Sequence, residues 1–239
     1  MRHLIDFGDL SRQEWDQLYA RASQIIDAPE KFIDVCRGKV AANLFYEPST
    51  RTNFSFQTAM LRLGGTVFGF ADPNSSSVAK GETLKDTIKM VSNYADVIVM
   101  RTPTEGAAKA ASLYADVPVI NAGDGGHMHP TQTLADLLTI REHFGHLKGI
   151  RMTYMGDARY NMGNSLMIAC TKLGMHFVAC TSKKYFPNAE LVAQCEEYAK
   201  ASGGSITLTE DVQTGTKDAD VIYTDVWVSM GEPDEVWTE

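Results

Sequence analysis

The sequence lacks several patterns that would place it in a common functional class. It contains no run of about 18 apolar residues, which is the length a membrane-spanning helix needs, so we expect no transmembrane segment. The opening residues, MRHLIDFGDLSRQEW, lack the apolar core of a secretory signal. The P-loop pattern GxxxxGK[ST] and the dinucleotide fingerprint GxGxxG are also missing, so two common nucleotide-binding signatures are excluded.

Basic residues and paired cysteines are also scarce. The 239 residues include 22 Lys and Arg against 30 Asp and Glu, giving a net charge of -8. This balance argues against general nucleic-acid binding, so any bound anion needs a local basic cluster. The four cysteines lack CxxC spacing, and reduced thiols in a cytoplasmic protein are the expected state. No Cys/His pair has ligand spacing apart from His127 and His129, and we predict neither a metal nor a cofactor.

The sequence does contain a regular alternation of strand and helix patterns. The predicted strands cover residues 39–46, 66–72, 95–101, 117–124, 150–157, 175–182, 205–211 and 218–227. The predicted helices cover residues 52–65, 81–94, 104–114, 131–145, 164–174, 188–204 and 212–217. Such alternation predicts an α/β protein of two domains, each a mostly parallel sheet flanked by helices, the second incomplete. We place the domains at residues 1–145 and 146–239.

Unusual polar clusters follow nearly every predicted strand. They are EPSTRT, DPNSSS, RTP, NAGDGGHMHPTQ, GDARYNMGN and DVWVSM. Ligands of open parallel sheets bind outside the carboxyl ends of the strands. The clusters therefore predict where a ligand binds.

The first cluster combines hydroxyls and a guanidinium at a predicted helix start. Ser49, Thr50, Arg51 and Thr52 would surround unpaired backbone N–H groups at the positive end of the helix dipole. Helix capping alone needs one Ser or Thr, so four polar groups with an arginine favour an anion site. In HMHPTQ, a histidine before a helix could polarise a carbonyl oxygen, although His127 and His129 could instead be capping or core residues.

Together these motifs resemble one family. FYEPSTRTNFSF, SSSVAKGET, VIVMRTP, NAGDGGHMHPTQTLADLLTI, GDARYNMGNSL and DVWVSMGE are similar, in order, to segments of the aspartate/ornithine carbamoyltransferases. The resemblance implies a domain that binds carbamoyl phosphate and a second that binds the acceptor amino acid. It also implies a cytoplasmic homotrimer with shared active sites.

The resemblance also implies roles for particular residues. Ser49, Thr50, Arg51 and Thr52 would hold the phosphate, and Arg101, His129 and Gln132 the carbamoyl group. Ser76 and Lys80 lie in a segment that resembles the family's mobile loop, which reaches a neighbouring subunit's site. An exposed loop with no binding role would have the same sequence pattern. The acceptor ligands would be Asn161, Asp225, Ser229 and Met230. Arg51, Arg101, His129 and Gln132 would be catalytic, without a covalent intermediate, metal or cofactor.

The two halves of the chain resemble enzymes that use different acceptors. The first half resembles aspartate enzymes, and the second resembles ornithine enzymes. Aspartate enzymes carry an arginine at the position of Met162, and this chain has no arginine after Arg159. A dicarboxylate needs bidentate cationic partners, so ornithine is favoured over aspartate, with putrescine or another amine left open. Ornithine would indicate arginine biosynthesis, and aspartate pyrimidine biosynthesis.

Two further departures from the family pattern matter. The family usually has arginine and glutamate at the positions of Asn53 and Gln57, and we interpret the change as a compensated swap of a structural pair. The chain stops at Glu239, before a segment that the family carries, so it resembles a fragment or a join of two relatives. A silent carbamoyl phosphate-binding subunit and a generic phosphate-binding protein therefore remain alternatives.

Overall fold

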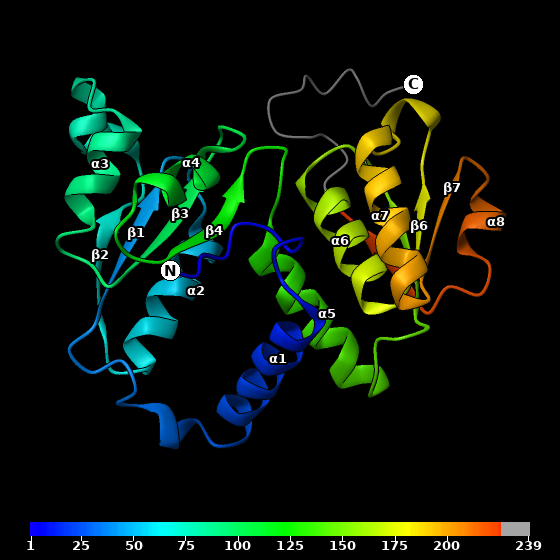
Figure 1. The fold of residues 1–239 in the computed structure, drawn as a ribbon, viewed down its shortest axis with the longest axis horizontal. Helices are drawn as coiled ribbons and strands as arrows, with labels where there is room; N and C mark the ends of the chain where they lie inside the picture. The colour runs from blue at the N-terminus through cyan, green and yellow to red at the C-terminus, as the bar shows by residue number, and fades with distance from the viewer. Residues whose placement is uncertain (226–239) are drawn as a thin grey trace. The chain divides into compact units, whose positions relative to one another are not determined.

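The computed structural model describes residues 1–225 and divides the chain into two compact units, Met1–Thr131 and Gln132–Glu239. In the described part, each unit contains one four-stranded sheet in which every pairing is parallel (Figure 1). The predicted α/β class, with two helix-flanked parallel sheets, is confirmed.

The sheet of the first unit has the strand order β2-β1-β3-β4. Its strands are β1 Val40–Phe45, β2 Thr66–Phe70, β3 Val97–Thr102 and β4 Val119–Asp124. The helices that alternate with them are α2 Thr50–Arg62, α3 Leu84–Val91 and α4 Ala107–Tyr114. Short 3-10 helices cover Pro29–Phe32, Pro73–Ser75 and Ser77–Lys80. Buried side chains of β1, β3, α3 and α4 form one apolar cluster that includes Leu44, Ile88, Ile98 and Ala111.

The N-terminal helix α1, Arg12–Asp27, lies outside the predicted alternation. A capping box begins it: the Ser11 hydroxyl accepts from the Glu14 N–H at 3.2 Å, and the Glu14 carboxylate accepts from the Ser11 N–H at 2.8 Å. The spacing of Ser11 and Glu14 is the sequence signal that predicts such a start. Before α1, Leu4 forms an isolated parallel bridge with Ile120 of β4, and the Leu4 N–H donates to Val119 O at 2.9 Å.

The sheet of the second unit has the strand order β7-β6-β5-β8. Its strands are β5 Arg151–Met155, β6 His176–Cys180, β7 Ser205–Thr209 and β8 Val221–Thr224. The helices are α5 Pro130–Phe144, α6 Asn161–Leu173, α7 Ala189–Ser202 and α8 Val212–Thr216, with a 3-10 helix at Lys183–Tyr185. The first two residues of α5 belong to the first unit and the remainder to the second.

Each sheet has a point where the chain switches direction along the strand order. In the first unit β1 lies between β2 and β3, and in the second unit β5 lies between β6 and β8. Connections leave such a neighbouring pair in opposite directions, which opens a crevice at the carboxyl ends of the two strands. The topology thus marks the ends of β1 and β3, and those of β5 and β8, as the ligand-binding edges.

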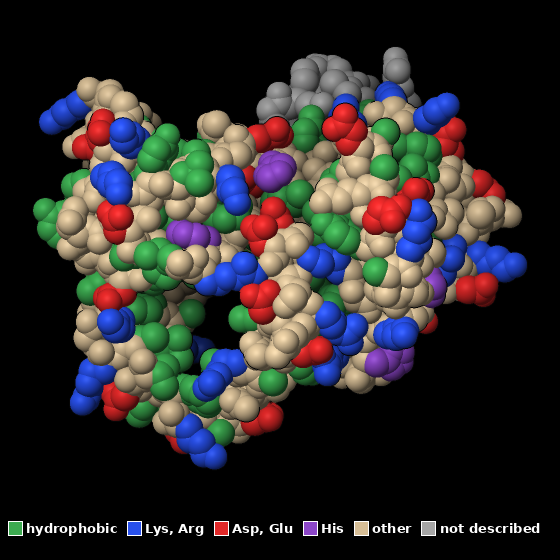
Figure 2. Space-filling view, in the orientation of Figure 1, with side chains coloured by type: hydrophobic (Ala, Val, Ile, Leu, Met, Phe, Trp, Pro, Cys, Tyr) green, Lys and Arg blue, Asp and Glu red, His purple; other side chains and the backbone are tan. Residues whose placement is uncertain are grey.

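Acidic and basic side chains are interspersed over the face drawn in Figure 2. Because no large basic area stands out in the described part of this face, an anion site in this acidic chain depends on local geometry rather than on the overall charge.

Among the described residues, no helix combines the length and the apolar character needed to cross a membrane.

Candidate active site

The Ser49–Thr52 cluster begins α2, directly after β1. Ser49 is the N-cap residue with an extended backbone (φ -154°), but its side chain makes no capping hydrogen bond. The Arg51 side chain is exposed, and no ion pair with its guanidinium is present within residues 1–225. Capping therefore does not account for the Ser49 hydroxyl, and the first-turn N–H groups, Ser49 and Arg51 are together available to an anion.

Arg101 lies at the end of β3, opposite Phe45 of β1 in the parallel register. Its Nη1 donates to Ala122 O at 3.3 Å, and its Nη2 lies 3.6 Å from Glu47 Oε1. Both charged side chains are largely buried, with 12% and 14% of their surface exposed. Glu47 is a site residue that was not predicted from the sequence, although it lies two residues after the end of β1, in the stretch FYEPSTRT.

His129 contacts the same guanidinium. Its Nε2 lies 3.2 Å from Arg101 Nη1, and only 9% of the residue is exposed. Burial, together with the positive charge of Arg101, lowers the pKa of His129 to about 4. The imidazole is therefore neutral at physiological pH, and it accepts from Arg101 when its proton is on Nδ1. The structure thus brings together two of the residues predicted from RTP and HPTQ.

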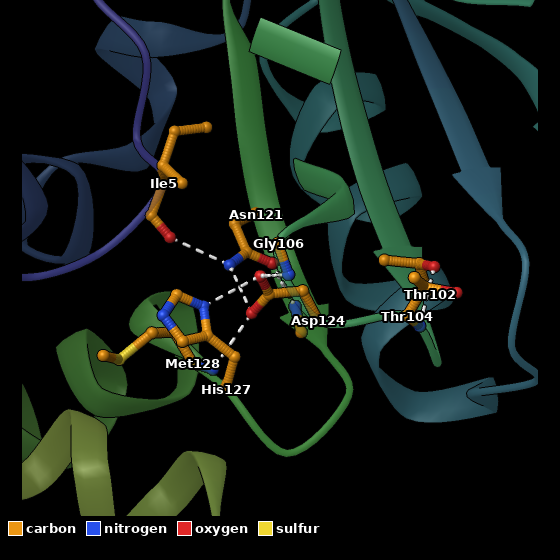
Figure 3. Close-up of polar contacts among 9 residues, drawn as sticks. Ile5, Thr102, Thr104, Gly106, Asn121, Asp124, His127 and Met128 are labelled. Atoms are coloured by element: carbon orange, nitrogen blue, oxygen red, sulfur yellow. Dashed lines mark hydrogen bonds and ion pairs between the residues drawn. The ribbon is translucent and has the colours of Figure 1, made fainter. Parts of the chain in front are cut away.

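A buried carboxylate supports the segment that leads to His129. Asp124, at the end of β4, has no exposed surface, and its Oδ1 accepts from Asn121 Nδ2 at 3.1 Å and from the Met128 N–H at 2.9 Å. Its Oδ2 accepts from the Gly106 N–H at 3.1 Å and pairs with His127 Nδ1 at 3.0 Å (Figure 3). The hydrogen bond to Asp124 raises the pKa of His127. His127 is thus a structural partner of Asp124, and Asp124 itself was not predicted.

Gly123 lies against the Arg101–His129 pair. Its φ is +119°, and a Cβ atom there would lie 3.1 Å from Arg101 Nη1 and 3.6 Å from His129 Cδ2. A side chain would be strained by the backbone and would crowd the guanidinium. The absence of a side chain at this position is therefore part of the site.

We expect Gly123→Ala to lower the free energy of unfolding by about 1–3 kcal/mol. Displacement of Arg101 should also raise the pKa of His129, because the nearby positive charge helps to lower it. Urea unfolding and NMR titration of the imidazole measure the two effects. Gly38→Ala is the control, since Gly38 also has a positive φ (+76°) but nothing lies within 4 Å of its added Cβ. An unchanged His129 pKa in Gly123→Ala would contradict the close approach.

Ser76 and Lys80 lie in the connection after the edge strand β2. The Ser76 hydroxyl accepts from the Val78 N–H at 3.3 Å and donates to Pro73 O at 2.8 Å, so it begins a 3-10 helix. Lys80 ends that helix and is exposed. Among the described residues, no hydrogen bond or ion pair joins either side chain to Ser49–Thr52, Arg101 or His129. Both therefore stay predictions.

The expected acceptor residues fall at the switch point of the second sheet. Asn161 is the first residue of α6, which follows β5, and Asp225 directly follows β8. Met155 and Thr224 pair across β5 and β8, so the two connections start side by side. Gln132 is exposed in the first turn of α5. Ser229 and Met230 lie outside the described residues.

The last arginine of the chain is occupied within its own loop. Arg159 Nε lies 2.9 Å from Asp157 Oδ1 and Nη2 lies 2.5 Å from Asp157 Oδ2, a bidentate ion pair. Met162, at the position where aspartate enzymes are expected to have arginine, is 5% exposed. The described part of this edge thus carries the carboxylates of Asp157 and Asp225, with its one guanidinium already paired.

The predicted pairing of Asn53 and Gln57 is confirmed. Gln57 Nε2 donates to Asn53 Oδ1 at 2.9 Å, and Asn43 Nδ2 donates to the same oxygen at 3.0 Å. Two amides thus join one turn of α2 to β1 without a charge, which agrees with a compensated swap.

Two family models match the chain, and between them they cover most of it. The model described as aspartate/ornithine carbamoyltransferase, carbamoyl-P binding domain, matches residues 2–142. The model described as aspartate/ornithine carbamoyltransferase, Asp/Orn binding domain, matches residues 148–239.

Individual relatives carry both names. The aspartate carbamoyltransferase catalytic subunit of Clostridium perfringens is 48% identical over 225 residues, which is 93% of this chain and 72% of the relative. The catabolic ornithine carbamoyltransferase of Treponema denticola is 50% identical over 211 residues, which is 88% of this chain and 61% of the relative. The structure of ornithine carbamoyltransferase from Pyrococcus furiosus matches with a TM-score of 0.91 and 38% identity, over 98% of this chain and 74% of that one.

Proposed function

The chain belongs to the aspartate/ornithine carbamoyltransferase family, and from this premise we propose that it transfers the carbamoyl group of carbamoyl phosphate to the amine of an amino acid. The observation that carries the proposal is the buried Arg101–His129 contact at the carboxyl edge of the first sheet, where α2 also begins. The helix start follows β1, Arg101 lies at the end of β3, and His129 follows β4, so all three come from the carboxyl edge of one sheet.

The proposed mechanism uses charge and alignment rather than a covalent intermediate. The first-turn N–H groups of α2, the hydroxyls of Ser49, Thr50 and Thr52, and Arg51 hold the phosphate. Arg101 and His129 bind the carbonyl oxygen, where negative charge develops when a neutral amine attacks the carbon. The C–N bond forms, phosphate leaves with the electrons of the C–O bond, and the proton lost by the amine passes to the departing phosphate. Alignment of the two reactants supplies much of the rate.

The neutrality of His129 suits this role. A positively charged imidazole beside Arg101 would repel the guanidinium, whereas the neutral ring can carry its proton on either nitrogen. Without substrate, Nε2 accepts from Arg101 Nη1. When the carbonyl oxygen enters between the two groups, the tautomer with its proton on Nε2 donates to that oxygen together with Arg101. Glu47 holds the other terminal nitrogen of Arg101 and so limits the rotation of its guanidinium.

We further propose ornithine as the acceptor, with Asn161, Asp225, Ser229 and Met230 as the residues that bind it. The support is the charge at the β5/β8 edge, where Arg159 is paired with Asp157 and Asp225 adds an exposed carboxylate, the kind of group that binds an ammonium. A second carboxylate on the acceptor would find no unpaired arginine in this described part of the edge.

Aspartate is the second candidate acceptor. The support for it is that relatives with that name are as similar to this chain as the ornithine enzyme, at 48% and 50% identity. Lys80, in the loop that also contains Ser76, would then supply the cation for the second carboxylate of aspartate.

The proposal includes a homotrimer with shared active sites, to which Ser76 and Lys80 contribute across a subunit contact. Its support is an exposed apolar face of α2, where Phe54 and Leu61, seven residues apart, are 60% and 58% exposed. We also place the boundary between the carbamoyl phosphate domain and the amino-acid domain at residues 145 and 146. The matched ranges 2–142 and 148–239 support that boundary.

We expect purified chain with carbamoyl phosphate and ornithine to form citrulline faster than it forms carbamoyl aspartate from aspartate. The assay offers ornithine, aspartate and putrescine separately and measures each carbamoylated product with phosphate release. Asp225→Asn is the matched variant, since it should weaken binding of an ammonium group and raise the KM for ornithine. Carbamoyl aspartate as the main product would select the second candidate. Binding of carbamoyl phosphate without any product would favour a silent subunit.

A further inference from the structure

The Asp136 carboxylate, one turn into α5, uses both oxygens on partners from different elements. Its Oδ1 accepts from Gln132 Nε2 at 2.9 Å, within the same helix. Its Oδ2 accepts from the Tyr223 hydroxyl of β8 at 3.1 Å, across 87 residues of sequence. All of these residues belong to the second unit.

This contact decides which way the Gln132 amide faces. Burial raises the pKa of Asp136, but both of its oxygens accept hydrogen bonds, as those of an ionised carboxylate do. Such a carboxylate has no hydrogen to donate, so only the NH2 side of the amide can bind it. The amide oxygen, Oε1, is consequently the end that is turned away from Asp136. A carbamoyl group presents an NH2 donor, and an amide oxygen is the acceptor it requires.

Tyr223 holds the carboxylate in place from the other side. Its ring stacks on Tyr154 with centroids 5.8 Å apart and an interplanar angle of 17°, and burial raises the pKa of its hydroxyl. The hydroxyl therefore stays protonated and donates to Asp136. Asp225 lies two residues after Tyr223, directly after β8. The strand that restrains Asp136 therefore also leads to the proposed acceptor ligand.

We propose that Asp136 is a positioning residue for carbamoyl transfer, which holds the Gln132 carboxamide so that its oxygen, an acceptor for an NH2 group, is the end left for the substrate. Asp136 does not contact the substrate itself. The inference rests on the proposed function, because it takes Gln132 as a ligand of the carbamoyl group, the role that the family resemblance implies.

The decisive variant is Asp136→Asn. The new amide can accept from Tyr223 with its oxygen and donate to Gln132 Oε1 with its nitrogen. The Gln132 amide would then turn over, and its NH2 group, a donor, would be left for the NH2 group of the substrate, which is also a donor. We expect kcat/KM for carbamoyl phosphate to fall about tenfold to a hundredfold, as misplacement of a binding group does. Glu142→Gln is the matched control, since Glu142 is an exposed acid further along α5 and its change removes the same charge.

A double-mutant cycle separates positioning from a structural role. If Asp136 acts through the Gln132 amide, Asp136→Asn should cause no further loss of kcat/KM in a Gln132→Ala background. Additive losses would overturn the inference, because they would show that Asp136 acts independently of Gln132. Thermal unfolding of all four proteins shows whether a lower kcat/KM comes from a destabilised fold. Tyr223→Phe removes one hydrogen bond to the Asp136 carboxylate and leaves its charge in place, so it tests the same positioning with a smaller change.

The wild-type chain is measured first, both for turnover and for binding of carbamoyl phosphate by calorimetry. If it binds carbamoyl phosphate without turnover, the same cycle is read from the dissociation constants. If it neither binds nor turns over carbamoyl phosphate, the proposed function fails and the inference fails with it. Normal wild-type activity with an unchanged kcat/KM in Asp136→Asn would overturn the inference alone.

Discussion

Replacing Arg51 by alanine should lower carbamoyl transfer by at least about a hundredfold, with a weaker affinity for carbamoyl phosphate. The reason is that Arg51 is the one guanidinium in the first turn of α2, where the Ser49 side chain makes no capping bond. Its charge is needed both to bind the phosphate and to stabilise it as it leaves. Steady-state kinetics and calorimetry with carbamoyl phosphate measure the two losses.

Arg62→Ala is the matched control for this prediction. Arg62 is also exposed, but it lies in the last turn of the same helix, at the opposite end of the dipole. Its replacement should leave turnover and binding close to those of the wild type. Normal binding of carbamoyl phosphate by Arg51→Ala would show that the phosphate is held elsewhere.

The same variant also tests the shared site. Mixing inactive Arg51→Ala with inactive Lys80→Ala should restore activity if one subunit supplies Arg51 and its neighbour supplies Lys80. Subunits would need to be dissociated and reassembled together, with each variant treated alone for comparison. No recovery in a mixture that forms oligomers would place Lys80 outside the neighbouring site.

The second large effect is expected from His129. His129→Ala should lower kcat about a hundredfold to a thousandfold, the usual loss when one donor to a developing oxyanion is removed. The KM for carbamoyl phosphate should change much less, because the phosphate contacts remain. His129→Gln retains a neutral donor and should be less impaired. An unchanged kcat in His129→Ala would remove the residue from the oxyanion role.

The pKa of His129 gives a further test of the same residue. The pKa in the folded protein is about 4, below the 6.5 of an ordinary histidine, so the unfolded chain binds a proton first as the pH falls. Wild-type stability should therefore be intact above pH 6.5 and decline towards pH 4, by up to about 3 kcal/mol from this group. His129→Gln should lack that part of the decline in urea unfolding at a series of pH values. An equal decline in both proteins would mean that His129 is not buried in its neutral form.

Local patterns in the sequence predicted the fold class and much of the candidate site. Apolar runs bounded by glycine and polar clusters predicted every strand of the two described sheets. The runs of β1, β3, β4, β5 and β6 are apolar because those strands are largely buried. The capping box of α1 is also a local sequence pattern, but that helix lies outside the strand–helix alternation and was not predicted. The motifs STRT and HPTQ marked ligand-binding positions because they directly follow strands, and parallel strands end at one edge.

Contacts between distant residues were decided only by the tertiary structure. The strand orders β2-β1-β3-β4 and β7-β6-β5-β8 set which connections lie together, and no local pattern encodes them. The ion pair of Arg101 with Glu47, the burial of Asp124 and the bond from Tyr223 to Asp136 join segments up to 87 residues apart. The low pKa of His129 likewise requires a buried ring beside a guanidinium, since desolvation and nearby charge act through space. Residue types and their order thus determined the chemistry available at each strand end, whereas packing decided which groups meet and in which protonation state.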